Sequence, residues 1–201
     1  MAKAYIFDYG GVIINIDYHA TIKAFEQLGL NDFKGLYTQA AQSELFDDIE
    51  TGKISQMHFI NRLLDLLPEG TTANQVGHAW NAMILDIPKK RLDLLDRLKE
   101  EHDIFLLSNT NEIHVDQANR SLKKVSNRPI DDYFKKVYLS HLINDRKPHA
   151  SAFQKIIDEN QLEKSEVVFI DDSIQHIESA QKLGLQTIHL QGELCDHPAF
   201  S

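Results

Sequence analysis

The chain has 201 residues, of which 42% are hydrophobic, and this is enough for one α/β core with a smaller appended unit. Its formal net charge of -9 argues against general affinity for nucleic acids, because a phosphate backbone binds basic surfaces. No apolar run approaches the roughly 20 residues that span a bilayer, so we expect no membrane segment.

The only cysteine is Cys195, so the chain cannot form an intramolecular disulfide. The N-terminus leads directly into the apolar segment 4–7, without the basic, apolar and small-residue succession of a secretory signal. We therefore expect a cytoplasmic protein that is a monomer or a weak homodimer.

Five short apolar runs, mostly rich in β-branched or aromatic residues, predict strands. Helical patterns between the later runs predict parallel pairing through right-handed crossovers. The fold class is therefore α/β, with a Rossmann-like parallel sheet and helices on both of its faces. The runs are 4–7, 104–107, 137–139, 167–170 and 187–190.

Three apolar stripes predict the helices between these strands. Pro148 is expected in the first turn of the second helix, and Gly184 at the end of the third. The stripes consist of Leu92, Leu95 and Leu98; of Phe153, Ile156 and Ile157; and of Ile174, Ile177 and Leu183.

The stretch 17–87 shows helical stripes and no convincing strand. Ser55 is the expected N-cap of its middle helix, and Pro88 marks the return to the sheet. We predict that 17–87 forms a small helical cap over the carboxyl edge of the sheet. The segments 1–16 and 88–201 would together form the Rossmann-like core.

Polar residues follow the strands at the points where the strands end. In an open parallel sheet, ligands bind outside the carboxyl ends of the strands, so these residues are expected to converge on one edge. They are Asp8 and Gly10 after the first strand, Ser108 and Asn109 after the second, Lys147 after the third, and Asp171 with Asp172 after the fourth.

These residue types suit phosphoryl transfer to a carboxylate. Asp8 could attack phosphorus and form an acyl-phosphate that water later cleaves. Mg²⁺ prefers oxygen ligands and would lower the repulsion between the two anions. We expect Asp8, Asp171, Asp172 and the backbone carbonyl of Gly10 to hold this ion, with Asp171 near it or acting through water.

The remaining polar residues suit the transferring phosphate group. Ser108 and Asn109 can donate hydrogen bonds to its oxygens. Lys147 can neutralise developing charge, and its ammonium can keep Asp8 ionised. We therefore predict that all three residues bind the phosphate and that Lys147 also assists catalysis.

In this order, the motifs resemble those of the haloacid dehalogenase-like hydrolase superfamily. The matching segments are 7–12, 107–110, 147–148 and 169–173, and the resemblance covers nearly the whole chain. It implies a Mg²⁺-dependent phosphatase that hydrolyses a small phosphorylated metabolite, a sugar phosphate, through a phospho-aspartate intermediate.

The place of the helical segment resembles the helical-cap subgroup of that superfamily. Within the subgroup, segments 50–55, 107–111 and 177–180 are most similar to bacterial glucose-1-phosphate phosphatases. They also resemble the phosphatase domain of soluble epoxide hydrolases.

The chain departs from the superfamily pattern at Gly10. Phosphatases of this kind usually carry a second aspartate there, which protonates the leaving alkoxide. General acid–base help is worth about 10²–10⁴-fold, so the chain could be a slow or non-catalytic phosphate-binding protein. Alternatively, its substrate has a good leaving group, such as an anomeric phosphate. The similar glucose-1-phosphate phosphatases also carry glycine at this position, which favours the second interpretation.

A metal-independent haloacid dehalogenase is a less favoured alternative, because the paired carboxylates Asp171 and Asp172 would then be unexplained. The ten histidines show no zinc spacing and have no cysteine partners. Tyr18, His19 and His114 follow the first two motifs and are candidates for substrate contact.

Overall fold

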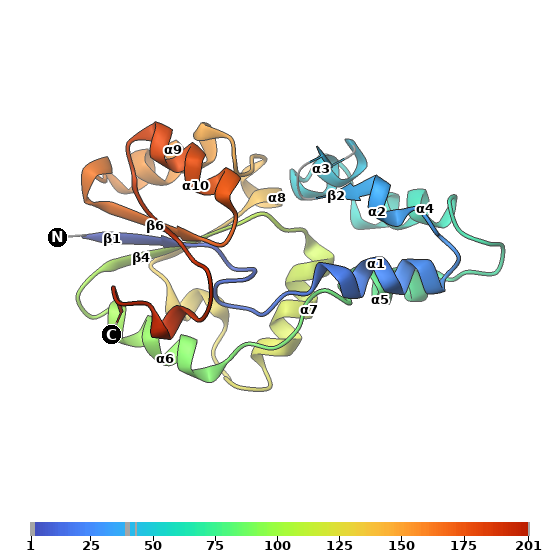
Figure 1. Ribbon diagram of the computed structural model, residues 1–201, viewed down its shortest axis with the longest axis horizontal. Coiled ribbons are helices and arrows are strands. Elements are labelled where there is room, and N and C mark those ends of the chain that lie inside the picture. Colours follow the sequence, from blue (N-terminus) through green and yellow to red (C-terminus); the bar gives the residue numbers. More distant parts are fainter. Residues whose placement is uncertain (1–2, 39–40, 43, 201) are drawn as a thin grey trace.

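The structure is a computed structural model that describes residues 3–38, 41–42 and 44–200. Its centre is a parallel sheet with strand order β5-β4-β1-β6-β7 (Figure 1). All five runs predicted as strands are strands, and the predicted α/β class with a Rossmann-like parallel sheet is confirmed. The strands are β1 (Ala4–Phe7), β4 (Asp103–Ser108), β5 (Lys136–Leu139), β6 (Val167–Asp171) and β7 (Gln186–His189).

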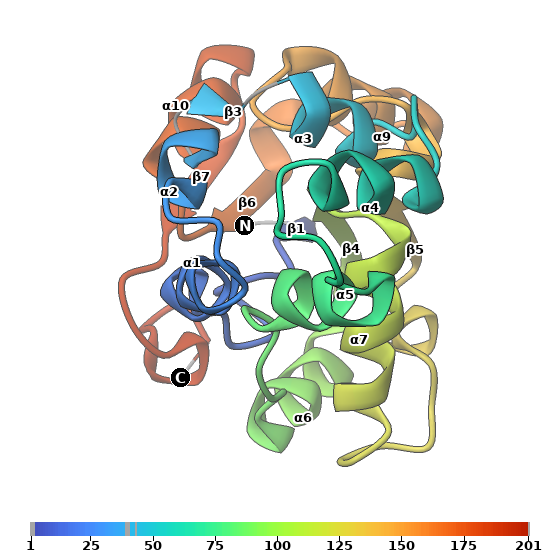
Figure 2. The same ribbon diagram turned by 90° about the vertical axis from the view of Figure 1, so that its right-hand side faces the viewer.

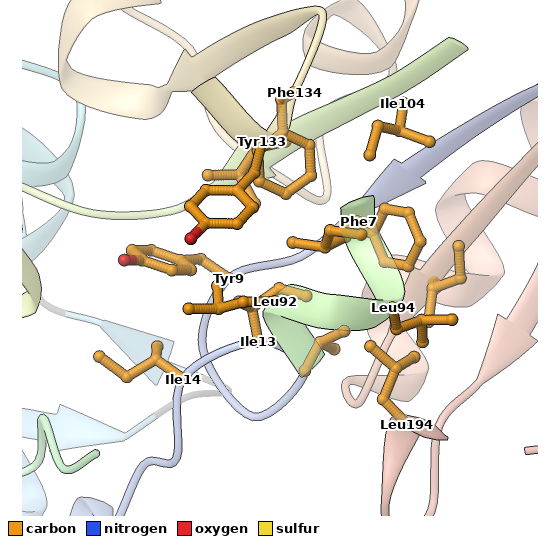
Figure 3. Close-up of a cluster of buried hydrophobic side chains, with 14 of the residues drawn as sticks. Phe7, Tyr9, Ile13, Ile14, Leu92, Leu94, Ile104, Tyr133, Phe134 and Leu194 are labelled. Atoms are coloured by element: carbon orange, nitrogen blue, oxygen red, sulfur yellow. The ribbon is translucent and has the colours of Figure 1, made fainter. Parts of the chain in front are cut away.

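Helices cover both faces of the sheet. Successive side chains of a strand point to opposite faces, so Ile6 packs toward one helical layer and Phe7 toward the other. Figure 3 shows Phe7 against Leu92 and Leu94 in the second layer. The first layer contains α9 (Ala150–Asn160) and α10 (Ile174–Leu183); the second contains α6 (Lys89–Leu98) and α7 (Glu112–Leu122).

Several helix ends agree with the sequence prediction. Ser55 accepts a hydrogen bond from the backbone of His58 at 3.2 Å and is the N-cap of α4. Gly184 ends α10 with φ of 97°, a left-handed conformation that favours glycine.

One detail of the prediction was wrong. Pro148 lies before α9, whose N-cap is His149, and is therefore outside the first turn. The stripe of Ile174, Ile177 and Leu183 does form a helix, α10, but Ile174 is 50% exposed. As the first residue of α10 it lies just past the carboxyl end of β6, where the sheet no longer covers it.

The helices α1 to α5 lie between β1 and β4, within residues 17–87, which we call the insertion. Figures 1 and 2 show them beyond the carboxyl ends of the sheet strands. They enclose a hydrophobic cluster of their own, built around Phe25, Phe46 and Trp80, and Ile113 of α7 joins it. The helices are α1 (Tyr18–Gln27), α2 (Phe33–Leu36), α3 (Glu44–Glu50), α4 (Gln56–Leu64) and α5 (Ala73–Asn81).

The insertion also contains two antiparallel strands that were not predicted, β2 (Tyr37–Thr38) and β3 (Ala41–Gln42). Each has two residues, which is too short to produce a recognisable alternation of apolar and polar residues. The domain boundaries at 16/17 and 87/88 stay a prediction. Among the described residues, none of the helices has both the length and the apolarity to cross a membrane.

Candidate active site

Carboxylates from two neighbouring strands meet at the carboxyl edge of the sheet. Asp8 directly follows β1, while Asp171 ends β6 and Asp172 comes next. One oxygen of each carboxylate lies within 4.8 Å of the others. The predicted convergence of these three residues is therefore present.

Lys147 lies between two of these carboxylates. Its Nζ is 2.6 Å from Asp8 Oδ1 and 2.7 Å from Asp171 Oδ2, and its side chain is fully buried. Asn109 fixes the backbone of this lysine at both polar atoms: its Oδ1 accepts from Lys147 N–H at 2.9 Å, and its Nδ2 donates to the Lys147 carbonyl at 2.8 Å. The end of β4 thus determines where the lysine stands.

Asp171 is held as an ionised, fully engaged group. Its Oδ1 accepts the backbone N–H of Ser173 at 2.7 Å, and its Oδ2 contacts both Lys147 and His176 Nδ1, the latter at 2.9 Å. Burial raises the pKa of Asp171, but the charge of Lys147 and the contact with His176 outweigh it and lower the pKa to about 2. This carboxylate therefore mainly positions the lysine.

The other two carboxylates are less stable in their charged forms. Burial raises the pKa of Asp8 to about 6, although Lys147 opposes the shift. Desolvation and the charges of Asp8 and Asp171 raise the pKa of Asp172 to about 7. The pair carries more negative charge than Lys147 neutralises, so a divalent cation would stabilise it.

The donor set fits Mg²⁺, which takes one or two carboxylates together with other oxygens. Asp8 and Asp172 would supply the carboxylates. The loop after β1 approaches Asp172 so closely that a Cβ on Gly11 would lie 2.2 Å from its Oδ2. Gly11 also has φ of 74°, so both its conformation and its contact require glycine.

One pocket connects these groups. Asp8 and Asp172 line it, whereas the buried Asp171 is not among the residues of its wall. The insertion contributes Tyr18 and Glu50 to its wall. Of the predicted site residues, those that line this pocket are Asp8, Gly10, Ser108, Asn109, Lys147 and Asp172.

The wall beside Gly10 is apolar. A Cβ on Gly10 would lie 2.6 Å from Ile16 Cδ1, so Ile16 occupies the space where a side chain at position 10 would begin. Ile14, Met83 and Ile84 line the same pocket. The place where an acidic side chain at position 10 would stand is therefore lined by apolar residues.

The candidate substrate contacts differ in their surroundings. Tyr18 lines the pocket and His19 does not. His114 lines it too, but its ring stacks on Trp80 at 4.5 Å and its Nε2 is 3.1 Å from the Trp80 carbonyl. Burial lowers the pKa of His114 to about 4. This histidine is therefore neutral near pH 7 and packs α7 against α5.

Sequence reasoning missed Glu50, Arg146 and His176, which also line the pocket. Arg146 had a signal, because it directly precedes Lys147. His176 had none, since its contact with Asp171 depends on how α10 is rotated about its axis. Glu50 lies in a segment used for the family resemblance, but its direction could not be predicted.

Comparisons with known proteins agree with this geometry. The family model described as haloacid dehalogenase-like hydrolase matches residues 5–190. The D-ribitol-5-phosphate phosphatase of Bacteroides thetaiotaomicron is 32% identical over 187 residues, which are 93% of this chain and 91% of that protein.

Solved structures give the same result. A HAD family enzyme from Bacteroides thetaiotaomicron, an aspartate-to-alanine variant in complex with magnesium and inorganic phosphate, superposes with a TM-score of 0.90. It has 30% identity and 95% coverage of both chains. A predicted HAD-like family hydrolase from Porphyromonas gingivalis gives a TM-score of 0.84 at 30% identity, with coverage of 94% of this chain and 90% of that chain.

Proposed function

The chain belongs to the haloacid dehalogenase-like hydrolase family, and from this premise we propose that it is a Mg²⁺-dependent phosphatase of a small sugar or alditol phosphate. The observation that carries the proposal is the position of Lys147 between Asp8 and Asp171. Lys147 and Asp8 line a pocket that Asp172 also lines. A similar protein is named for D-ribitol 5-phosphate, and a similar structure holds magnesium and inorganic phosphate.

In the proposed reaction, a carboxylate oxygen of Asp8 attacks phosphorus and the bond between phosphorus and the ester oxygen breaks. The substrate leaves as an alkoxide that takes up a proton. A water molecule then attacks the phospho-aspartate, which returns the carboxylate and releases inorganic phosphate. Mg²⁺, held by Asp8, Asp172 and the Gly10 carbonyl, would supply charge neutralisation for the phosphate oxygens.

The other site residues would orient the phosphate. The ammonium of Lys147 balances charge near Asp8, and Ser108, which lines the pocket, would donate a hydrogen bond to the phosphate through its hydroxyl. Asn109 acts on the phosphate through the position it gives Lys147, in addition to the direct contact predicted from the sequence. Asp171 would keep the lysine in place.

The lack of an acid at position 10 bears on the leaving group. An anomeric phosphate needs less protonation than a primary ester, so it should be hydrolysed faster if the proton donor limits the rate. D-Ribitol 5-phosphate, however, is an ester of a primary alcohol. A relative named for that substrate makes an alditol or a sugar 5- or 6-phosphate an equal candidate.

The test is a phosphate-release panel with and without Mg²⁺. It contains D-ribitol 5-phosphate, glucose 1-phosphate, glucose 6-phosphate and a nucleotide. We expect Mg²⁺-dependent release that EDTA abolishes and that is lost in Asp8→Asn but kept in Asp93→Asn. Asp93 is a matched control because it forms an exposed ion pair with Lys89 on α6.

A second candidate function is phosphate binding without turnover, which the glycine at position 10 favours. In that case no substrate of the panel would release phosphate, whereas beryllium or aluminium fluoride with Mg²⁺ would still bind. Halide release from a 2-haloacid that survives EDTA would instead support dehalogenase chemistry. Phosphate release that survives EDTA would count against a metal-dependent phosphatase.

The cellular setting is part of the proposal. The lone Cys195, which is not in a disulfide, suits a cytoplasmic location. We propose a monomer or weak homodimer, and light scattering of the purified protein tests this state directly.

A further inference from the structure

Glu50 is a carboxylate that the insertion places in the wall of the phosphoester pocket. It ends α3, is only 5% exposed, and lines the same pocket as Asp8 and Tyr18. Buried carboxylates are uncommon unless they are paired. A buried carboxylate beside a phosphoester site therefore calls for an explanation.

The turn after Glu50 is fixed to the sheet side of the molecule. Asn144 Nδ2 donates to the Thr51 carbonyl at 3.0 Å. Gly52, with φ of 70°, packs so closely that a Cβ would lie 2.2 Å from the carbonyl of His141. These contacts hold the end of α3, and Glu50 with it, over the pocket.

Arg146 pairs with two carboxylates of α3. Comparing these two carboxylates distinguishes attachment of α3 to Arg146 from contact with a molecule in the pocket. Its Nη2 is 3.2 Å from Glu50 Oε2, and its Nη1 forms an ion pair with Asp47. The Glu50 side chain is 7% exposed and lines the pocket, whereas the Asp47 side chain is 47% exposed and does not. Both residues attach α3 to Arg146, but only Glu50 lines the pocket.

The charges around the pocket limit what a substrate can carry. Arg146 and Lys147 line the pocket, and each already pairs with two carboxylates. A second anionic group on a phosphoester would therefore meet Glu50 where both of these cations are already paired.

We propose that Glu50 determines specificity by accepting a hydrogen bond from a hydroxyl group of the substrate. The inference rests on the proposed phosphatase function and deepens it, since it selects neutral polyhydroxylated esters over alkyl or carboxylated ones. A carboxylate can accept about four hydrogen bonds, so a carboxylate that already has partners can still accept one from a substrate.

Tyr18 complements this acceptor in the same pocket. A tyrosine phenol is protonated at neutral pH, because its ordinary pKa is about 10. Tyr18 can therefore donate a hydrogen bond into the pocket that it lines. A hydroxyl group both donates and accepts, so it can use Glu50 and Tyr18 together, whereas an alkyl chain uses neither.

The experiment compares D-ribitol 5-phosphate with n-pentyl phosphate, which has five carbons and no free hydroxyl. The ratio of their kcat/KM values is measured for the wild type, Glu50→Leu and Asp47→Leu. A hydrogen bond to a charged group corresponds to about a 10- to 100-fold preference. We expect Glu50→Leu to reduce the ratio by at least about tenfold, and Asp47→Leu to leave it within about threefold.

The same ratio is measured for Kd by calorimetry in an Asp8→Asn background with Mg²⁺. The binding ratio tests the role of Glu50 even if the wild type releases no phosphate. Absence of phosphate release would refute the phosphatase function and not the role of Glu50. Glu50→Gln is measured alongside in case Glu50→Leu fails to fold, and it should shift the ratio in the same direction by less.

Two outcomes overturn the inference. An unchanged ratio in the Glu50 variants would mean that Glu50 does not contact the substrate. An equal loss of the ratio in Asp47→Leu would mean that both carboxylates act only by attaching α3 to Arg146.

Discussion

Replacing Lys147 with methionine should destabilise the protein and abolish turnover. The ammonium is fully buried between Asp8 and Asp171, at 2.6 Å and 2.7 Å. Removing one partner of a buried ion pair costs about 3–5 kcal/mol, because the other charge stays buried without compensation. That is a large share of the about 5–15 kcal/mol by which domains are stable.

The size of the effect should depend on pH in a defined direction. The folded-state pKa of Asp171 is lowered to about 2 from 3.8. The stability that this shift provides is therefore complete above about pH 4 and is lost as the pH falls toward 2. The part of the difference between the wild type and Lys147→Met that comes from Asp171 should accordingly be full at pH 7 and narrow below pH 4.

Equilibrium urea unfolding followed by far-UV circular dichroism measures this difference. With a slope of about 2 kcal/mol per molar urea, the midpoint should fall by about 2 M. The double variant Lys147→Met/Asp171→Asn should regain part of the loss, because it removes the charge left without a partner. A loss below about 1 kcal/mol, or no recovery in the double variant, would refute this account of Lys147.

Three further predictions concern the metal and the loop after β1. Mg²⁺ affinity should rise from pH 5 to 8, because Asp8 and Asp172, with pKa values of about 6 and 7, must lose protons to bind the ion. Calorimetry in two buffers measures both the affinity and the protons released, and a pH-independent affinity would contradict the prediction. Gly11→Ala should lower Mg²⁺ affinity at least about tenfold, because the added Cβ clashes with Asp172, and should lower stability by about 1–2 kcal/mol through strain at φ of 74°. Unchanged affinity in the same titration and unchanged stability in urea unfolding would exclude that contact. Gly10→Asp combined with Ile16→Ala should raise kcat for D-ribitol 5-phosphate by up to about 10²-fold if the missing acid limits the rate. Ile16→Ala alone is the control, and no gain over it would show that proton donation is not limiting.

The sequence was informative where a residue's position follows from chain topology. Asp8, Ser108 and Asp171 each stand at the end of a buried strand, and parallel strands place such ends at one edge. Lys147 could be added because it follows the third predicted strand. None of these predictions needed the direction of an individual helix.

Prediction was weaker for residues whose role depends on the direction in which their side chains point. His176 contacts Asp171 and Glu50 faces the pocket because of the rotation and docking of α10 and α3, which apolar periodicity does not fix. The same limit explains Ile174, which belongs to an apolar stripe and still ends beyond the sheet. Asn109 shows a further limit, since a turn residue next to a phosphate site can also hold the backbone of a neighbouring loop.

Two of the contacts between the insertion and the sheet side differ in character. At α7, Trp80 stacks on His114 and Ile113 completes the apolar cluster, so separation there would expose hydrophobic surface at about 25 cal/mol per Å². At α3, the contacts are ion pairs and hydrogen bonds of Arg146 and Asn144, and the pair with the exposed Asp47 adds little stability. We therefore expect separation of the insertion from the sheet side to cost less free energy along α3 than along α7.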